Sequence, residues 1–509
     1  MDMVVDKIKQ WKELIFTCYS INFLGCLYSC PIYLIFFIYS VGDSMLDAVL
    51  RPNISQLVCF NMFPDRLDTC QNMENRPDLE DDIQKQATLY IIYHKCLSNL
   101  PVLVLGLFCG AWSDIYGRKL PMVLPSIGTT FAILLFMSAN VHRRSSLAFF
   151  LSGSLIQGCF GKVSLFIVAV NSYAADVTNT SSRTNQLGLL ASMQFFGLFM
   201  GSLIAGLLLD NTDVLTTYCT ASFMHALVVV LALWIVKETV AANEGTEVFP
   251  CRTLFRQANL KESLMVLVKK REFNLRRSLC GLIFIMMLNQ TCQSGLTDVT
   301  LLYTELPLLS WPTTWFGYLT AVSYAAMGII LLIILPILSN VLKLSDPIIS
   351  MLGLGFESVR FIILTWSTHS WMIWMSVGFG SLGELINSPA RSLLSKLVHE
   401  DEVGKIFAVL ASGETLAKFP GLILTTLYGT TLDIFPRIPF LVASALYTIM
   451  SFLILNVHMS TREYVGRDDN SDNGFESRSQ SDEYIQLNNE HDLKDNIVNA
   501  FNTSKQLHK

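Results

Sequence analysis

The groups that could carry chemistry in this chain are charged side chains set into long apolar stretches. Glu384 and Arg391 stand seven residues apart, so they share one face of a helix if Pro389 does not break it. A cation on that face could anchor the carboxylate of a bound solute, and the glutamate could titrate beside it. The alternatives are a purely structural ion pair and an arginine that extends to a polar interface.

Three further stretches place ionisable groups in apolar surroundings. Glu414 and Lys418 are four residues apart, in the order that favours pairing along a helix. Residues 357 and 360, a glutamate and an arginine, can pair in the same way. Lys162 is the deepest cation of the N-terminal half, which favours a bound anion or a counter-carboxylate near it.

The stretch 277–303 carries many polar side chains, including Gln293 and Asp298. Such a helix is expected to have a face on water, although Asp298 could instead be solvated at its end. The chain has no Gly-Lys-Ser/Thr phosphate loop, no Cys/His metal spacing and no histidine beside a serine and an acid. We therefore expect no enzyme activity, no cofactor and no metal site.

Long apolar runs must position these groups. Of the 509 residues, 52% are hydrophobic and 15% are charged, against about 25% charged in an average soluble protein. The apolar segments reach about 20 residues or more, the length that crosses a bilayer. A large soluble core is the alternative, but its helices would alternate apolar and polar faces, and these runs mostly do not. We expect an all-α integral membrane protein whose partner is the lipid bilayer, with no nucleic acid partner.

Twelve transmembrane helices are expected. They cover residues 15–41, 88–112, 120–140, 147–174, 185–209, 215–236, 277–303, 314–338, 347–367, 370–394, 404–428 and 436–457. Lysine and arginine gather on one side of this topology, which predicts that both termini are cytoplasmic. Residues 142–144 are the main exception. Glycines at 197 and 201 with an alanine at 205 follow a spacing that permits close helix approach.

Composition divides the chain into four parts. Residues 237–276 are polar and charged, as expected for a cytoplasmic linker between two six-helix bundles at 1–236 and 277–458. Residues 459–509 are rich in Asp, Asn, Ser and Glu and are predicted to be a disordered cytoplasmic tail. The sequence at 484–487 has the spacing of a tyrosine-based sorting signal. A plasma membrane is the simplest location, with the endosome or lysosome membrane as the alternative.

A polar loop at 42–87 is expected to face outward or into a lumen. It contains Asn53 in an Asn-Ile-Ser sequon, a predicted glycosylation site. Cys59 and Cys70 lie in the same loop and could form a disulfide there. Pairing with another loop and free thiols remain open.

The segment 110–119 reads Gly-Ala-Trp-Ser-Asp-Ile-Tyr-Gly-Arg-Lys between two apolar runs. Its charged residues must lie in a very short aqueous turn. The pattern, formed by Gly110, Asp114, Gly117, Arg118 and Lys119, resembles the loop between helices 2 and 3 of the major facilitator superfamily. The resemblance implies two six-helix bundles that alternate access to a central site, with the aspartate and arginine of this turn in a cytoplasmic latch.

Other stretches resemble solute carrier family 46, the proton-coupled folate transporter and its relatives. They include Asp176 and Arg183 after span 4, residues 298–303 in span 7, and residues 389–398 after span 10. The resemblance implies a secondary active transporter of organic anions or amphiphiles, such as folates, muropeptides or steroid conjugates, with the proton as coupling ion. Arg391 matches the family's cationic residue, a proposed substrate contact.

Two departures from the family pattern affect proton coupling. Where the folate transporter has a glutamate in span 5, this chain has Ala191, and where it has a histidine in span 7, this chain has Gln293. Neither residue titrates, so Glu384, Glu414 or Asp298 would have to carry the proton if protons drive transport. A receptor or scaffold that binds ligand without moving it is the alternative function.

Overall fold

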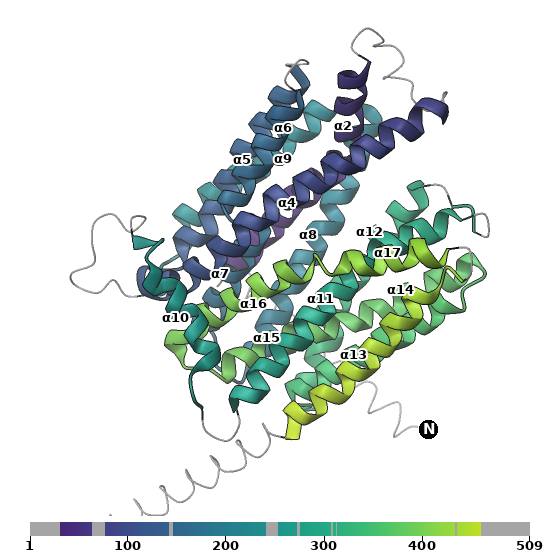
Figure 1. Ribbon diagram of the computed structural model, residues 1–509. Helices are drawn as coiled ribbons and strands as arrows, with labels where there is room; N and C mark the ends of the chain where they lie inside the picture. Colours follow the sequence, from purple (N-terminus) through teal and green to yellow (C-terminus); the bar gives the residue numbers. More distant parts are fainter. Residues whose placement is uncertain are drawn as a thin grey trace, which may run out of the picture.

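The computed structural model describes residues 31–63, 77–141, 146–240, 253–271, 275–306, 309–311, 313–432 and 435–459. All regular structure in these ranges is helical (Figure 1). The N-terminal half contains α2 (Ile32–Met62), α4 (Pro77–Tyr116), α5 (Lys119–Val141), α6 (Ser146–Cys159), α7 (Lys162–Asp176), α8 (Arg183–Asn211) and α9 (Val214–Trp234). The short helix α10 (Gln257–Val268) follows.

The C-terminal half begins with α11 (Leu275–Glu305) and α12 (Thr313–Ile329). It continues with the π-helical turns η5 (Ile330–Ile334) and η6 (Ile337–Val341), α13 (Asp346–Thr365), α14 (Ser370–Gly383), the 3-10 turn η7 (Glu384–Ile386), α15 (Asn387–Lys396), the 3-10 turn η8 (Glu400–Glu402), α16 (Val403–Ala417) and α17 (Gly421–Thr431). A last helix covers Ile438–Met459. Figure 1 shows the helices of the N-terminal half, purple to blue, on one side of the molecule and those of the C-terminal half, green to yellow, on the other.

Ten helical segments in the described ranges are long and apolar enough to cross a membrane. Two further predicted spans are built from pairs of shorter helices, α14 with α15 and α16 with α17. This arrangement is consistent with twelve spans, and eleven of the predicted ranges overlap the observed helices closely.

The predicted end of the first span, at residue 41, was wrong. Helix α2 covers Ile32–Met62, so residues 42–62 of the expected outer loop are helical. Residues 15–30 of the predicted span lie outside the described residues. Two aspartates follow the predicted end at Val41, and the first of them, Asp43, points into the protein and is only 8% exposed. A charge that faces the bundle interior does not end a membrane helix.

Close helix contacts use the small residues that the sequence singled out. A Cβ added to Gly197 would lie 2.6 Å from the carbonyl oxygen of Phe37, and one added to Gly201 would collide with the carbonyl of Val41. Helices α2 and α8 therefore pack backbone against backbone, as the spacing predicted. The larger cores are separate: one gathers residues almost entirely from the C-terminal half, and two belong to the N-terminal half.

Several spans are interrupted near their middle. Between α6 and α7 the backbone passes through left-handed conformations at Gly161 (φ 94°) and Lys162 (φ 47°). Between α16 and α17 a turn at 418–420 contains Pro420, which cannot continue the hydrogen-bond ladder. An interruption leaves backbone N–H and C=O groups without their helical partners. Membrane proteins tolerate this where the interrupted backbone is buried in protein or lines a cavity.

Candidate functional site

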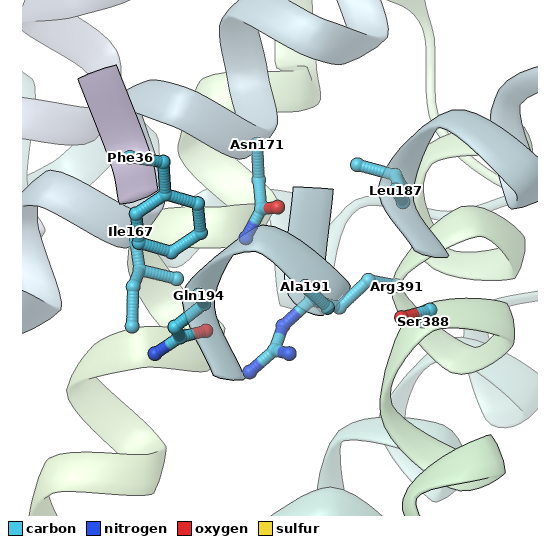
Figure 2. Close-up of a pocket in the computed structure, with 8 residues that line it drawn as sticks. All are labelled: Phe36, Ile167, Asn171, Leu187, Ala191, Gln194, Ser388 and Arg391. Atoms are coloured by element: carbon cyan, nitrogen blue, oxygen red, sulfur yellow. The ribbon is translucent and has the colours of Figure 1, made fainter. Parts of the chain in front are cut away.

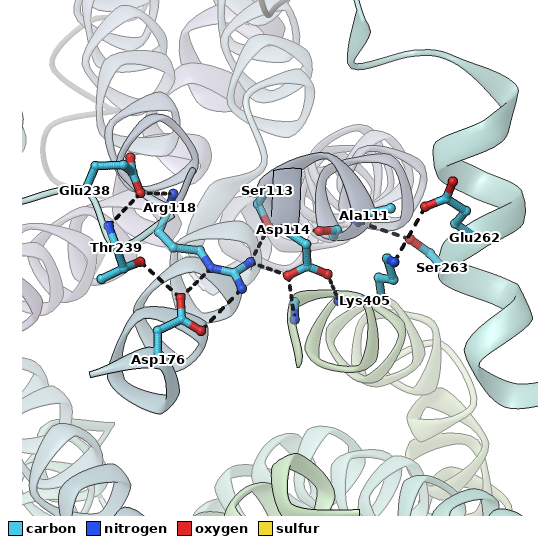
Figure 3. A network of polar contacts seen from close by, with 12 residues as sticks. Ala111, Ser113, Asp114, Arg118, Asp176, Glu238, Thr239, Glu262, Ser263 and Lys405 are labelled. Atoms are coloured by element: carbon cyan, nitrogen blue, oxygen red, sulfur yellow. Dashed lines mark hydrogen bonds and ion pairs between the residues drawn. The ribbon is translucent and has the colours of Figure 1, made fainter. Parts of the chain in front are cut away.

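The turn at 110–119 forms a buried ion network (Figure 3). The guanidinium of Arg118, 2% exposed, lies 2.6 Å from Asp114 Oδ1 and donates to Asp176 Oδ2 at 2.9 Å and to Ser113 Oγ at 2.8 Å. Because removing one partner of a buried pair leaves an uncompensated charge, such a loss costs about 3–5 kcal/mol. The network therefore fixes the end of α4 against the end of α7.

Asp114 also joins the two halves of the molecule. Its carboxylate oxygens accept hydrogen bonds from the backbone N–H groups of Gly404 at 2.9 Å and Lys405 at 3.1 Å. These are free donors in the first turn of α16, where a carboxylate is favoured by the helix dipole. Gly110 permits this approach, because a Cβ there would collide with Ala408. We call this contact the Asp114 latch.

Glu238, which was not among the predicted site residues, supports the turn that carries the latch. The carboxylate of Glu238 accepts from the backbone N–H groups of Arg118 at 2.7 Å and Lys119 at 3.2 Å, at the start of α5. Gly117 adopts φ 113°, and a side chain there would meet this carboxylate. The backbone conformation and the space at this turn thus require glycine at 117, as the pattern implied.

A second contact between the halves lies at the start of α8, and we call it the Asp346 latch. Thr184 Oγ1 donates to Asp346 Oδ1 at 2.7 Å, and Lys396 Nζ donates to Asp346 Oδ2 at 2.7 Å. Arg183 Nη1 reaches Ser395 Oγ at 3.3 Å. Sequence reasoning found the arginine but did not predict the contacts of Asp346 with Thr184, 162 residues away in the chain, and with Lys396, 50 residues away.

The linker segment closes the same side of the molecule, which we call the linker side. Helix α10 packs on α4, where Ser263 Oγ donates to Leu107 O at 2.7 Å. Glu402 forms ion pairs with Lys269 and Arg271, the second at 2.7 Å. Burial would raise the pKa of Glu402, but hydrogen bonds and charge from these two cations outweigh it and hold the pKa below its ordinary value.

Glu384 and Arg391 do not form the ion pair that was one alternative for them. Arg391 Nη2 instead donates to Glu414 Oε1 at 2.9 Å and Oε2 at 3.2 Å, while Glu384 accepts from Asn387. The 3-10 turn η7 shifts the two residues out of helical phase, so the arginine turns toward α16. The expected pairing of Glu414 with Lys418 was also wrong, because Glu414 is held by Arg391.

A pocket lies beside this pair, between α7 and α8 of one half and α15 of the other. Its cavity volume is about 10 Å³, room for about one water molecule, and it is lined by Phe36, Ile167, Asn171, Leu187, Ala191, Gln194, Ser388 and Arg391. Figure 2 shows the guanidinium of Arg391 next to Gln194, with Asn171 across the pocket. The lining combines apolar side chains with two amides and one cation.

The remaining predicted site residues have separate places. Gln293 Nε2 donates to the buried Glu357 at 3.0 Å, and Glu357 pairs with Arg360 at 3.3 Å, as its spacing predicted. Asp298 lies at the other end of α11, where it faces Arg51 at 3.4 Å and a second cation of the N-terminal half at 3.9 Å. Asp298 therefore bridges the halves opposite the linker side.

Two predictions concern the outer loop expected at 42–87: a glycan on Asn53 and a disulfide between Cys59 and Cys70. Asn53 is fully buried inside α2, and the amide nitrogen that would carry a glycan donates to Tyr218 Oη at 2.7 Å. This contradicts the expected glycosylation of Asn53, because the acceptor nitrogen cannot be reached in the folded protein. Cys59 is disulfide-bonded, and its predicted partner Cys70 lies outside the described residues.

The model of the Major Facilitator Superfamily matches residues 96–422. The chain belongs to the Major Facilitator Superfamily. It is 24% identical over 399 residues to the proton-coupled folate transporter of Bos taurus, which covers 76% of this chain and 82% of that protein. It is 24% identical over 431 residues to the lysosomal proton-coupled steroid conjugate and bile acid symporter SLC46A3 of Gallus gallus, which covers 82% and 91%.

Solved structures agree with the family. The human organic anion transporter MFSD10 superposes with a TM-score of 0.63 at 17% identity, over 83% of this chain and 98% of that one. This major facilitator protein is therefore a multi-pass membrane transporter, similar to solute carrier family 46.

Proposed function

We propose that this protein is a proton-coupled symporter that carries organic anions or amphiphilic metabolites by alternating access between its two halves. The observation that carries the proposal is the Arg391–Glu414 ion pair at the edge of the pocket. Both side chains are partly exposed there, at 17% and 15%. A guanidinium in this position can exchange its protein carboxylate for a carboxylate or sulfate of the substrate.

The same pair can link the proton to the solute. While Glu414 is ionised, it satisfies Arg391 and competes with any anionic substrate. A proton taken from the acidic compartment neutralises Glu414 and releases the guanidinium for the substrate anion. When the proton leaves on the other side, the pair reforms and expels the solute. This exchange gives symport without the two titrating groups that Ala191 and Gln293 replace.

The latches supply the gate in this proposal. The Asp114 and Asp346 latches close the linker side, so the pocket would load from the opposite side. The placement of lysine and arginine assigns the linker side to the cytoplasm. The acidic compartment is then the cell exterior or the lumen of an endosome or lysosome. Two six-helix units, 1–236 and 277–458, would rock about the pocket, joined by the linker 237–276 and followed by the cytoplasmic tail 459–509.

The substrate class follows from the lining and from the relatives. The lining mixes apolar side chains with two amides and Arg391, and once the two halves move to widen the pocket it fits a rigid amphiphile with an anionic end. One relative is named for folate and another for steroid conjugates and bile acids. The lysosomal relative also supports an endosome or lysosome membrane as the location, with the plasma membrane as the other possibility.

Uptake by cells that display the protein at their surface tests this function. Labelled estrone sulfate and methotrexate are offered at about pH 5.5 and about pH 7.4 to wild type, Arg391→Ala and Arg277→Ala. Arg277 is an exposed arginine of α11 and serves as the matched control. We expect acid-stimulated uptake that falls at least about tenfold in Arg391→Ala and persists in the control, since one charge-assisted contact contributes about 1.5–3 kcal/mol. Binding without uptake would favour the receptor alternative.

A further inference from the structure

A second charged cluster lies inside the helical bundle, next to the Arg391–Glu414 pair. It consists of Asp43 and Asp47 on α2, Lys162 at the start of α7 and Lys418 in the break between α16 and α17. The carboxylate of Asp43 interacts electrostatically with both lysines, and the lysines interact with each other. The cluster thus joins two anions of the N-terminal half with one cation from each half.

None of the four side chains makes a direct ion pair or hydrogen bond within the described residues. Asp43 is 8% exposed, so a carboxylate in a membrane-spanning helix lies buried without a contact partner. Charges in this position cost several kcal/mol unless they are paired or hydrated. The lysines also repel each other across the seam between the halves. The four formal charges balance while both aspartates are ionised, and a proton on Asp43 leaves an excess positive charge that an anion between the two ammonium groups would neutralise.

The backbone brings the two lysines to the same level. Ser164 Oγ of α7 lies 3.3 Å from Thr415 Oγ1 of α16, two residues after Lys162 and three before Lys418. Lys162 stands at the start of α7, where the partial positive charge of the helix N-terminus adds to that of its ammonium group. Lys418 caps the C-terminal end of α16, three residues before α17 begins.

We propose that Lys162 and Lys418 form a second anion subsite, for which the carboxylate of Asp43 is the resident counter-ion that a proton must neutralise before the anion binds. The proposal rests on the proposed symport function and extends it to the substrate. Lys418 is four residues beyond Glu414 on the same span, a rise of about 6 Å. The favoured substrate class is therefore an amphiphile with two anionic groups, one at Arg391 and one between the lysines.

Other groups also face the aspartates and enter their pH response. They are Tyr39 on α2, His225 on α9, which packs against Gly42 and the Tyr39 ring, and Tyr324 on α12. Helix α8 contributes no charged group at this level, since its contact with Ser44 is the carbonyl of Leu198. His94 on α4 faces Lys162 from the other side. Proton binding at Asp43 removes the negative charge that both lysines share.

Radiolabelled inorganic sulfate tests the subsite on the full-length protein in lipid nanodiscs. We expect wild type to bind sulfate at about pH 5.5 and to lose affinity at about pH 7.4. Lys162→Gln and Lys418→Gln should each weaken binding by about tenfold or more, because each removes one charge-assisted contact. Asp43→Asn should bind at about pH 7.4 as wild type does at about pH 5.5, and Lys418→Arg should restore binding. Monodisperse elution of each variant checks that it is folded.

Competition with methotrexate, which carries two carboxylates, distinguishes a free anion from a substrate group. If the subsite takes a substrate group, methotrexate displaces labelled sulfate in wild type; if it takes only free anions, it does not, and the link to the substrate is overturned. Sulfate binding that is absent in wild type, or unchanged in both lysine variants, overturns the subsite itself. Sulfate binding does not require flux. Sulfate binding by wild type that is lost in Lys162→Gln, together with no uptake by cells that display wild type, would therefore contradict the symport proposal alone.

Discussion

Replacing Asp114 with alanine should shift the protein toward a state that is open on the linker side. In the closed state its carboxylate accepts two backbone hydrogen bonds from the other half, at 2.9 and 3.1 Å. A hydrogen bond to a charged group contributes about 1.5–3 kcal/mol, so even the lower value gives about 3 kcal/mol for the two. That energy corresponds to a shift of about a hundredfold in the equilibrium between closed and open states. Arg118 keeps its contact with Asp176, so the fold of the N-terminal half should survive.

The assay places a reactive thiol in the pocket. Ala191→Cys is introduced after the exposed cysteines 159, 219 and 280 are replaced by serine, and the same chain without Ala191→Cys measures the labelling of the remaining cysteines. A membrane-impermeant maleimide is then applied from each side of sealed vesicles. We expect labelling from the linker side to increase strongly in Asp114→Ala and labelling from the opposite side to fall.

The control for this experiment is Asp213→Ala, which removes an exposed aspartate that only caps α9 through Thr216. It should leave both labelling rates unchanged. Equal labelling of wild type and Asp114→Ala from the linker side would refute the assignment of this carboxylate as a latch.

Three further substitutions test separate parts of the structure. Gly404→Ala should reproduce the labelling change of Asp114→Ala, because the new Cβ would collide with the Asp114 carboxylate; wild-type labelling would contradict this. The lowered pKa of Glu402 means that its ionised form stabilises the fold above its ordinary pKa, and that this contribution is lost as pH falls through the lowered value. The thermal unfolding temperatures of wild type and Glu402→Gln should therefore differ near neutral pH and converge in acid; a constant difference would contradict the ion pairs. Asn53→Gln should leave electrophoretic mobility unchanged, since no glycan is attached, and should lower stability by about 1–2 kcal/mol through the loss of the bond to Tyr218; a mobility shift would contradict burial of this residue.

Local sequence patterns predicted the parts of the site that depend on neighbours in the chain. The turn from Gly110 to Lys119 could be identified because a charged motif between two apolar runs has few places to lie. The pair of Glu357 and Arg360 follows from helical spacing alone. The packing of Gly201 against α2 follows from the four-residue spacing of small residues on one face of a membrane helix.

Contacts between distant segments could not be predicted in this way. Helical spacing paired Arg391 with Glu384, but η7 changes the phase and the arginine meets Glu414 of the next span. Asp346 shows no local signal, because its partners come from α8 and α15. Asp43 was missed for a different reason: an acidic residue after an apolar run suggests a loop, whereas here the charge turns inward and the helix continues.

Transport by purified protein in liposomes with an imposed pH gradient tests the central claim most directly. Wild type and Arg391→Ala are reconstituted, and uptake of labelled estrone sulfate is measured with the outside at about pH 5.5, with no gradient, and with a proton ionophore. Proton-coupled symport predicts accumulation above equilibrium that depends on the gradient, collapses with the ionophore and is lost in Arg391→Ala. Uptake that only equilibrates, or that is the same with and without the gradient, would contradict proton coupling through the Arg391–Glu414 pair.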